Sequence, residues 1–452
     1  MRKRFPGALV IMVSTALAVT LPILTGGGGG PDAAHPARTG VSVLRHGTVV
    51  GQRASQAPPP GPPPKHTAVD PGVTRARWTG TWAASPQRPV LLGSFRNVTL
   101  RLIVHVTIGG GAARIRLSNE FGTVPLQIGA ATVGVQARGA AVRPGTLRRL
   151  TFNGGWTGDT VRPGAQATSD GVPEKVPAGA NLAVSLYLPA YTGPATKHAD
   201  AGRSHQTSYI SAPGDHADAP GALEYPLPVD QWYYLDGVDV DAPGASAVVT
   251  LGDSITDGTA STNNADHRYP DWLADRLRAA GGPYAKLSVL NEGLGGNELL
   301  RTSICCGASP SALDRLNTDV LDQPGVKDVI VLLGTNDIFR AHHATASAVI
   351  AGLKELITRI HARHLRVFGG TIPPSSLFSP SINQVREEVN HWIRTSRAFD
   401  GVEDFSRAVA DPRDPARLRP RYDSGGHLHP DDAGYRAMAN AVYLPGLLGN
   451  RS

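Results

Sequence analysis

The sequence predicts an α/β fold, in which a doubly wound, flavodoxin-like domain of three layers follows an antiparallel β-sandwich domain. Three observations predict it. Between residues 75 and 243, apolar residues recur at alternate positions, as they do in half-buried strands. From residue 244 to residue 450, short apolar runs alternate with helical patterns, which is typical of a parallel sheet covered by helices. Polar motifs rich in glycine follow these runs, at the edge where such sheets bind ligands.

The first 74 residues predict an export segment and a linker. Residues 1–30 contain a basic start, Arg2 to Arg4, and an apolar run that ends at Leu24. This pattern is typical of a secretory signal, and an uncleaved membrane anchor stays open because no clear Ala-x-Ala cleavage site follows. Residues 31–74 form a Pro/Gly-rich linker. We therefore expect a secreted protein that is either released or held near the membrane or cell wall.

Composition narrows the class of protein and its partners. Of the 452 residues, 41% are hydrophobic and 18% are charged, which indicates a globular chain. The net charge of +7 is spread along the sequence without a long basic tract, so we expect no nucleic-acid partner. The two cysteines, Cys305 and Cys306, are adjacent and cannot close a long loop. A vicinal disulfide, a reduced pair and pairing between chains all stay open, and two thiols alone make a poor metal site.

The β-sandwich domain is predicted from alternation over residues 98–108, 115–117 and 182–188, with Gly- and Pro-rich turns between the strands. Such a domain either binds polysaccharide or buttresses the domain that follows it. We predict that its tryptophans are core or interface residues rather than a sugar-binding platform. These are Trp78, Trp82, Trp156 and Trp232.

The α/β domain is predicted from a regular succession of strands and helices. The strands are expected at residues 247–251, 286–290, 327–333 and 365–371. The helices are expected at residues 271–280, 311–321, 344–364 and 382–397, with a last helix from about 430 to about 444.

Ser254 follows the first of these strands, within the sequence Gly252-Asp253-Ser254-Ile255-Thr256-Asp257-Gly258. A serine at the end of a rigid strand, flanked by glycines, is well placed to act as a nucleophile. The same residue types are also common in simple turns, so this segment alone does not decide between the two. We expect the nearby carboxylates of Asp253, Asp257 and Asp337 to hold turns and loops by hydrogen bonds.

Three further motifs follow strands or precede a helix, so they can converge with Ser254 on one crevice. They contain Gly296, Asn336 and His429. Acyl transfer requires a nucleophile, a base and hydrogen-bond donors for the oxyanion. Ser254 supplies the hydroxyl and His429 can accept its proton. The backbone N–H groups of Ser254 and Gly296, with the Asn336 side-chain amide, can supply the oxyanion donors.

These four motifs, in this order, resemble the four sequence blocks of the SGNH (GDSL) hydrolases over about residues 246–447. The upstream β region is similar to the N-terminal module of exported bacterial GDSL esterases. The resemblance implies hydrolysis of carboxylic esters of small molecules, polysaccharide or lipid through an acyl-serine intermediate, with no metal or organic cofactor. An acyltransferase that uses the same site, and a catalytically impaired binding protein of the same fold, stay open as alternatives.

One position departs from the family pattern. The family places an aspartate three residues before the catalytic histidine, and here that position is Gly426. Such a carboxylate orients the imidazole and stabilises its charged form. Three arrangements are consistent with the sequence: Asp423 replaces the missing carboxylate, a Ser254–His429 dyad works without one, or the enzyme is impaired. His427 is a competing candidate for the base, and we expect it to be a supporting loop residue.

Overall fold

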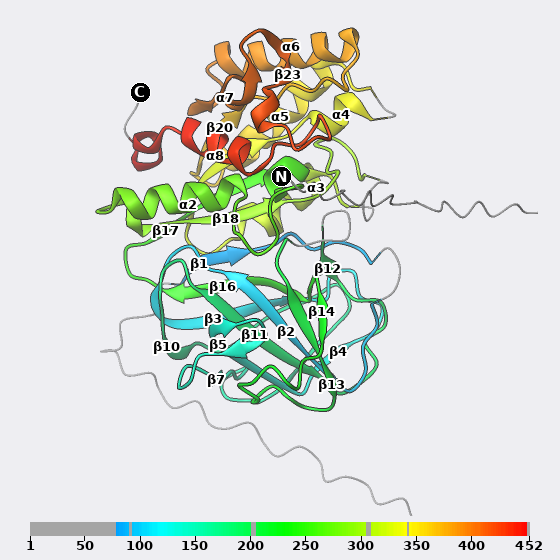
Figure 1. Cartoon of the computed structure of the whole chain (residues 1–452), viewed down its shortest axis with the longest axis vertical. Coiled ribbons are helices and arrows are strands. Elements are labelled where there is room, and N and C mark those ends of the chain that lie inside the picture. Colours follow the sequence, from blue (N-terminus) through cyan, green and yellow to red (C-terminus); the bar gives the residue numbers. More distant parts are fainter. Residues whose placement is uncertain (1–77, 90–92, 200–204, 304–308, 341–342, 450–452) are drawn as a thin grey trace, which may run out of the picture. The chain divides into compact units, whose positions relative to one another are not determined.

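The computed structural model describes residues 78–89, 93–199, 205–303, 309–340 and 343–449 (Figure 1). These residues belong to one compact unit that spans Asp70–Ser452. The predicted export segment, the whole of the predicted linker and the Cys305–Cys306 pair lie outside the described residues. Within the described ranges, no helix combines the length and the apolar character needed to cross a membrane.

Residues 78–241, here called the β region, fold into antiparallel sheets. The longer strands are β1 (Trp78–Ala83), β2 (Val98–His105), β3 (Gly110–Ser118), β5 (Ala130–Arg138), β10 (Val172–Val176), β11 (Asn181–Leu188), β13 (Ser208–Pro213) and β16 (Leu235–Asp241). The shorter ones are β4 (Leu126–Ile128), β6 (Ala141–Val142), β7 (Arg148–Arg149), β8 (Asp159–Val161), β9 (Gln166–Thr168), β12 (Lys197–His198), β14 (Leu227–Val229) and β15 (Trp232–Tyr233).

Two of these sheets enclose the core of the β region. A 5-stranded sheet has the order β1-β16-β3-β10, with β9 beside β3, and a 7-stranded sheet has the order β14-β13-β2-β11-β5-β6, with β7 beside β5. Leu100 and Leu102 on β2, like Ile115 and Leu117 on β3, are separated by one residue and belong to one buried apolar cluster. The alternation that predicted these strands therefore supplies apolar side chains from both sheets to one core.

The tryptophans of the β region do not all behave as predicted. Trp82 and Trp232 are buried and meet edge to face, with ring centroids 5.0 Å apart, which confirms them as core residues. Trp156 is 64% exposed, so it is not a core residue. It lies on a turn outside the long strands, where the alternation of apolar residues gives no indication of burial.

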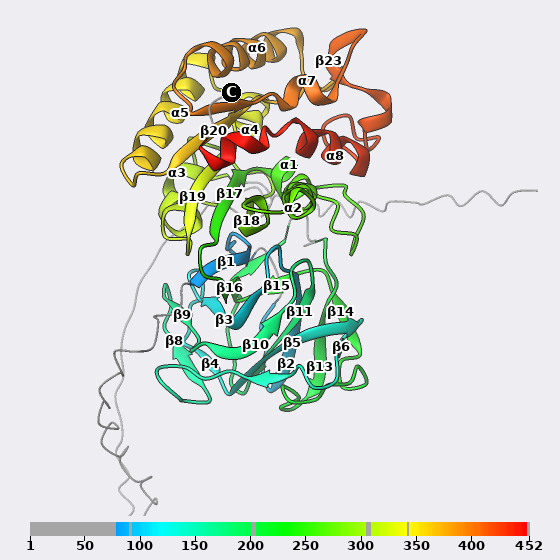
Figure 2. The ribbon, with the colours of Figure 1, turned by 90° about the vertical axis from the view of Figure 1, so that its left-hand side faces the viewer.

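Residues 246–449, here called the α/β region, contain a parallel sheet and helices (Figure 2). The strands are β17 (Ser246–Gly252), β18 (Leu287–Gly293), β19 (Val326–Leu332), β20 (Arg366–Gly370) and β21 (Gly401–Glu403), with a small hairpin of β22 (Ala410–Asp411) and β23 (Asp414–Leu418). The helices are α1 (Ser254–Asp257), α2 (Tyr269–Ala280), α3 (Ala312–Leu316), α4 (Thr335–Phe339), α5 (Ala346–His361), α6 (Pro380–Thr395), α7 (Phe405–Val409) and α8 (Asp432–Ala441).

The parallel sheet has the order β18-β17-β19-β20-β21, which is the flavodoxin-like order. Successive residues of its central strands enter different apolar clusters. Val249 packs in a cluster with residues of α5 and α6, whereas Val248 packs in another cluster with residues of α2 and α8. Alternate side chains of β17 therefore pack against different pairs of helices.

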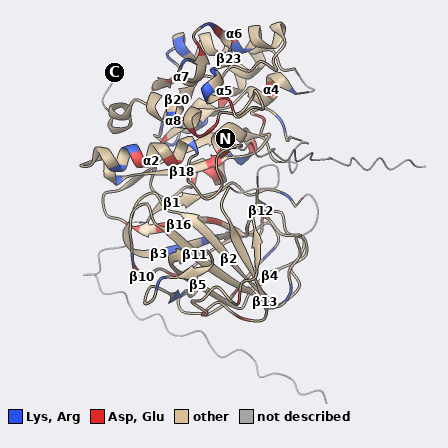
Figure 3. Ribbon diagram, viewed as in Figure 1, with Lys and Arg blue, Asp and Glu red and all other residues tan. Residues whose placement is uncertain are grey.

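The β region packs directly against the edge strand of the parallel sheet. Ala83 of β1 belongs to the apolar cluster that includes Leu290 of β18. A Cβ added at Gly80 would lie 2.9 Å from the Leu290 side chain, which shows how closely β1 approaches β18. The Thr107 hydroxyl accepts a hydrogen bond from the Val289 N–H of β18 at 3.2 Å. Lysines and arginines are scattered over both regions in Figure 3 and form no continuous strip along the ribbon.

Candidate active site

Ser254 lies where β17 turns into the short helix α1. The strand ends at Gly252 and the helix begins at Ser254. The Asp253 carboxylate accepts a hydrogen bond from the Ile255 N–H at 2.9 Å and caps the helix, as predicted. A Cβ at position 252 would lie 1.9 Å from the Thr256 hydroxyl, so this turn requires glycine. The turn places Ser254 at the carboxyl end of the sheet.

The Ser254 hydroxyl faces the imidazole of His429. Its Oγ lies 2.9 Å from His429 Nε2, a hydrogen-bonding distance between residues 175 positions apart in the chain. In the tautomer that carries the ring proton on Nδ1, Nε2 is free to accept the proton of the serine hydroxyl. The structure therefore brings together the residues that the sequence proposed as nucleophile and base.

Burial and two neighbouring basic side chains favour the neutral form of His429. Its pKa is lowered to about 4, first by burial and then by the charges of Arg340 and His205. Arg340 follows α4 and donates from Nε to Asn336 Oδ1 at 2.9 Å. His205 comes from the β region, so both regions shape the electrostatics of this site. The imidazole is a weak base that stays unprotonated in mildly acidic solution.

Asn336 joins the two chain segments that carry the other predicted oxyanion donors. Its Nδ2 donates to the Asn297 carbonyl at 2.9 Å and lies 3.4 Å from the Asp253 carboxylate. Asp253 precedes Ser254, and Asn297 follows Gly296. Within the described parts of the chain, the backbone N–H groups of Ser254 and Gly296 have no hydrogen-bond acceptor. Both are therefore available to an oxyanion.

The structure gives Asp423 a different partner from the one considered above. Its carboxylate accepts hydrogen bonds from the N–H groups of Gly425 and His427, each at 2.9 Å, and lies 2.6 Å from His427 Nδ1. These contacts close a tight turn in which His427 has a φ of 63°. Asp423 therefore does not orient His429, because its own loop takes up both carboxylate oxygens.

His429 Nδ1 has no hydrogen bond to any residue that the structure describes. Position 426 leaves room for a side chain, since a Cβ there would contact only Ser424 Oγ, at 3.8 Å. The His427 side chain is 57% exposed and pairs with Asp423 rather than with Ser254. Of the three arrangements that the sequence left open, the geometry does not support the one in which Asp423 replaces the missing carboxylate, whereas a Ser254–His429 dyad and an impaired enzyme both fit it.

The sequence was compared with models of known protein families. Residues 250–437 match the sequence model of the GDSL-like Lipase/Acylhydrolase family. The chain contains a GDSL hydrolase domain. This confirms the resemblance that the four motifs indicated, and it places Ser254, Gly296, Asn336 and His429 inside the matched range. Comparison with curated proteins found no match.

Several solved structures are similar to the GDSL hydrolase domain. One is a putative lipolytic protein of the G-D-S-L family from Desulfitobacterium hafniense, which is 20% identical in sequence. The alignment covers 43% of this chain and 97% of that protein, with a TM-score of 0.34. An aryl esterase from M. smegmatis is 18% identical in sequence. Its alignment covers 46% of this chain and 100% of the esterase, with a TM-score of 0.36. An acetyl xylan esterase from Geobacillus stearothermophilus is 20% identical in sequence. Its alignment covers 44% of this chain and 93% of the esterase, with a TM-score of 0.34.

His198 of the β region binds the helix that carries Ser254. Its Nε2 lies 3.2 Å from Asp257 Oδ1 at the end of α1, and its Nδ1 lies 2.8 Å from the Ser85 carbonyl oxygen. Burial lowers the pKa of His198, but the Asp257 carboxylate outweighs this effect and raises that pKa above its ordinary value. Sequence reasoning expected Asp257 to hold a loop and missed its partner, because no local pattern links positions 198 and 257.

Arg315 is a second supporting residue that sequence reasoning missed. It lies on α3 and is almost completely buried in the GDSL hydrolase domain. The guanidinium donates to the carbonyls of Gly252 and Glu292, each at 2.9 Å, and to Asn297 Oδ1 at 3.1 Å. It also pairs with Asp319 at 2.7 Å. Arg315 therefore ties the strand end before Ser254 to the segment that carries Gly296.

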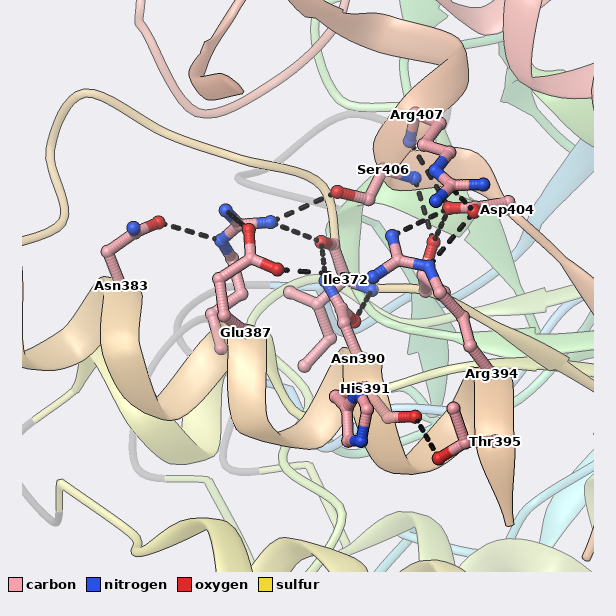
Figure 4. A network of polar contacts seen from close by, with 12 residues as sticks. Ile372, Asn383, Glu387, Asn390, His391, Arg394, Thr395, Asp404, Ser406 and Arg407 are labelled. Atoms are coloured by element: carbon pink, nitrogen blue, oxygen red, sulfur yellow. Dashed lines mark hydrogen bonds and ion pairs between the residues drawn. The ribbon is translucent and has the colours of Figure 1, made fainter. Parts of the chain in front are cut away.

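A polar network on α6 fixes the segment that follows β20 (Figure 4). Asn390 donates from Nδ2 to the Ile372 carbonyl at 2.9 Å and accepts from the Ile372 N–H at 2.7 Å. Arg394 holds the Asp404 carboxylate through two hydrogen bonds of 2.9 Å. Further along the same segment, the Ser375 hydroxyl donates to the His427 carbonyl at 2.7 Å. The network therefore supports the loop that leads to His429.

In the described part of the chain, no group of three or more His, Cys, Asp or Glu side chains is placed to hold a metal ion.

Asp337, the neighbour of Asn336, accepts hydrogen bonds from the Leu299 and Leu300 N–H groups at 2.9 and 3.0 Å. It holds a loop, as predicted.

Proposed function

We propose that this protein is an exported serine esterase that hydrolyses carboxylic esters of carbohydrate or lipid through an acyl-serine intermediate. The observation that carries the proposal is the 2.9 Å contact between Ser254 Oγ and His429 Nε2, next to the backbone N–H groups of Ser254 and Gly296, which have no acceptor among the described residues. The GDSL family match is consistent with ester chemistry. Export is inferred from residues 1–30 of the sequence alone.

In the proposed reaction, Ser254 Oγ attacks the ester carbonyl carbon while its proton passes to His429 Nε2. The carbonyl oxygen becomes an oxyanion, which the N–H groups of Ser254 and Gly296 stabilise. Asn336 can add a third donor, because its 3.4 Å contact with Asp253 is long for a hydrogen bond and easily exchanged. The alcohol then leaves with the proton from His429, and water attacks the acyl-serine by the same steps.

A fluorophosphonate probe tests the proposal, because it phosphonylates only an activated serine. We expect labelling of the wild type and no labelling of Ser254→Ala. Ser347→Ala is the matched control, since Ser347 lies on α5 and its hydroxyl contacts only Thr345 among the described residues. Hydrolysis of 4-nitrophenyl acetate should follow the same order. Folded wild-type protein that takes up no label would contradict the proposal and favour a binding protein of this fold.

Product analysis with an added alcohol separates the hydrolase from an acyltransferase. We expect free carboxylic acid as the main product even when the alcohol is abundant. A new ester as the main product would instead make this protein an acyltransferase that uses the same serine.

A further inference from the structure

The β region has a surface cavity of about 520 Å³ that the proposed chemistry does not use. Its lining comes from β4 and the glycine after it, from the turn and strand at residues 153–160, and from Pro189. β4 and β8 pair as an antiparallel ladder, with Gln127 opposite Thr160 and Ile128 opposite Asp159. None of the lining residues belongs to the GDSL hydrolase domain. The cavity is therefore a candidate site of its own.

Trp156 lines this cavity and is 64% exposed, which is unusual for the largest apolar side chain. Leaving such a ring in water instead of burying it forgoes about 2 kcal/mol or more. Exposure at this cost is often connected with recognition, because an indole ring offers a broad apolar face and an N–H donor.

Several hydrogen bonds hold the turn that carries Trp156. The N–H and carbonyl groups of Trp156 and Phe152 exchange two hydrogen bonds, of 2.7 and 2.8 Å, and Phe152 is fully buried. The Asp170 carboxylate accepts from the N–H groups of Gly154 and Gly155 at 3.0 and 2.9 Å. Since the turn is already ordered, a ligand that stacks on Trp156 loses little free energy to ordering it.

The polar side chains in the cavity are suited to hydroxyl groups. Asp159 Oδ1 accepts from the Thr160 N–H at 2.8 Å and from Asn153 Nδ2 at 3.2 Å. The other Asp159 oxygen and the Gln127 amide have no hydrogen-bond partner among the described residues. No lysine or arginine lines the cavity, which disfavours anionic ligands. With Trp156 as the only aromatic lining residue, the cavity also lacks the several rings of a quaternary-ammonium cage.

We propose that this cavity binds a neutral saccharide. Trp156 stacks on the apolar face of a pyranose ring, while Asp159 and Gln127 bind its hydroxyl groups. The site would hold a carbohydrate chain on the β region, and it does not depend on the proposed esterase activity.

The test measures binding of the full chain to xylohexaose, cellohexaose, maltohexaose and chitohexaose by isothermal titration calorimetry. We expect at least one of them to bind, and Trp156→Ala to weaken that binding about tenfold or more. Asp159→Asn should weaken it to a smaller extent. Leu227→Ala is the matched control, because Leu227 is a 56% exposed apolar residue of the β region outside the cavity.

Two further measurements separate a binding defect from misfolding or lost activity. The Trp156→Ala variant should keep the thermal unfolding midpoint and 4-nitrophenyl acetate hydrolysis of the wild type, and Ser254→Ala should keep full saccharide binding. Absence of binding to all four saccharides, or binding that Trp156→Ala leaves unchanged, would overturn the proposal. Binding of tetramethylammonium that depends on Trp156, without saccharide binding, would reassign the cavity to a cation.

Discussion

The His429 imidazole contacts Ser254 through Nε2, and its Nδ1 has no carboxylate partner among the residues that the structure describes. The absence of a neighbouring negative charge removes a stabilising contact for the imidazolium, while Arg340 and His205 disfavour it. The base is therefore weaker than in a complete triad, but it remains neutral to a lower pH.

The pH profile of activity should reflect this environment. Only the neutral imidazole can accept the Ser254 proton, so lowering its pKa to about 4 moves the acidic limb of kcat/KM downward from the ordinary histidine value. Arg340→Met removes one nearby positive charge and should raise the midpoint of that limb. Arg340→Lys retains the charge and should leave the midpoint low. Equal midpoints in all three proteins would show that the Arg340 charge does not affect the pKa of His429. Circular dichroism at each pH excludes unfolding as the cause of lost activity.

A substitution at position 426, in the loop before His429, should increase the activity. Gly426→Asp places a carboxylate where the family carries one, in a position with room for a side chain. We expect kcat to rise about tenfold or more and the pKa of His429 to rise with it, because a carboxylate near Nδ1 stabilises the imidazolium. Gly426→Asn is the matched control, with nearly the same size and no charge. If both variants behave alike, the dyad gains nothing from a carboxylate at this position.

Asp423 and His427 should affect activity only through the shape of their loop. We expect Asp423→Asn and His427→Ala each to lower kcat/KM about tenfold or less, whereas His429→Ala should remove most of the activity. The comparison is made with 4-nitrophenyl acetate. A loss in Asp423→Asn as large as that in His429→Ala would restore Asp423 as the residue that orients the base.

At the scale of elements, the strands and helices follow from local patterns, whereas their supporting contacts do not. The strand predicted at 327–333 is β19 with a shift of one residue, because a nearly continuous apolar run leaves little choice. The three-residue strand β21 was not predicted, since it is too short to show a period. Ser254 and His429 could be found because their motifs are local. The roles of His198 and Arg315 could not, because each depends on contacts between distant segments.

Arg315 on α3 offers a test of how the elements around Ser254 are held. Replacing it with methionine removes the hydrogen bonds to Gly252 and Asn297 and leaves Asp319 buried without its partner. We expect Arg315→Met to lower the free energy of unfolding by about 3–5 kcal/mol, as is usual when one member of a buried ion pair is removed. Arg278→Met is the control, since its pair with Asp275 is exposed and should contribute less than about 1 kcal/mol. Urea unfolding of both variants measures the difference, and equal losses would contradict the argument.

At the scale of the whole molecule, several buried carboxyl groups should make stability depend on pH. Burial raises the pKa of Glu403 and of Glu120 to about 7, and that of Asp236 and of Asp328 to about 6. In the unfolded chain these groups ionise near their ordinary values, so the folded state holds protons that the unfolded state has already lost. Their contribution to stability is complete below about pH 4 and is lost as the pH rises through about 6 to 7.

We therefore expect the thermal unfolding midpoint to be higher near pH 5 than near pH 8. Glu403→Gln should reduce this difference, because glutamine keeps an acceptor for the Tyr443 N–H, bonded at 3.0 Å, without a charge that must be buried. Glu355→Gln is the control, since its side chain is 59% exposed on α5. Calorimetry at both pH values makes the comparison, and an unchanged pH dependence in Glu403→Gln would show that this group does not contribute.

The contact between Thr107 and Val289 has a consequence for the solubility of the GDSL hydrolase domain. β18 is an edge strand, and an open edge offers unpaired backbone groups to the strands of other molecules. The Thr107 hydroxyl occupies one such N–H group, and β1 packs against the same strand. The β region thus blocks the edge against intermolecular strand pairing. A GDSL hydrolase domain produced without it would expose a template for aggregation, whatever its intrinsic ability to fold.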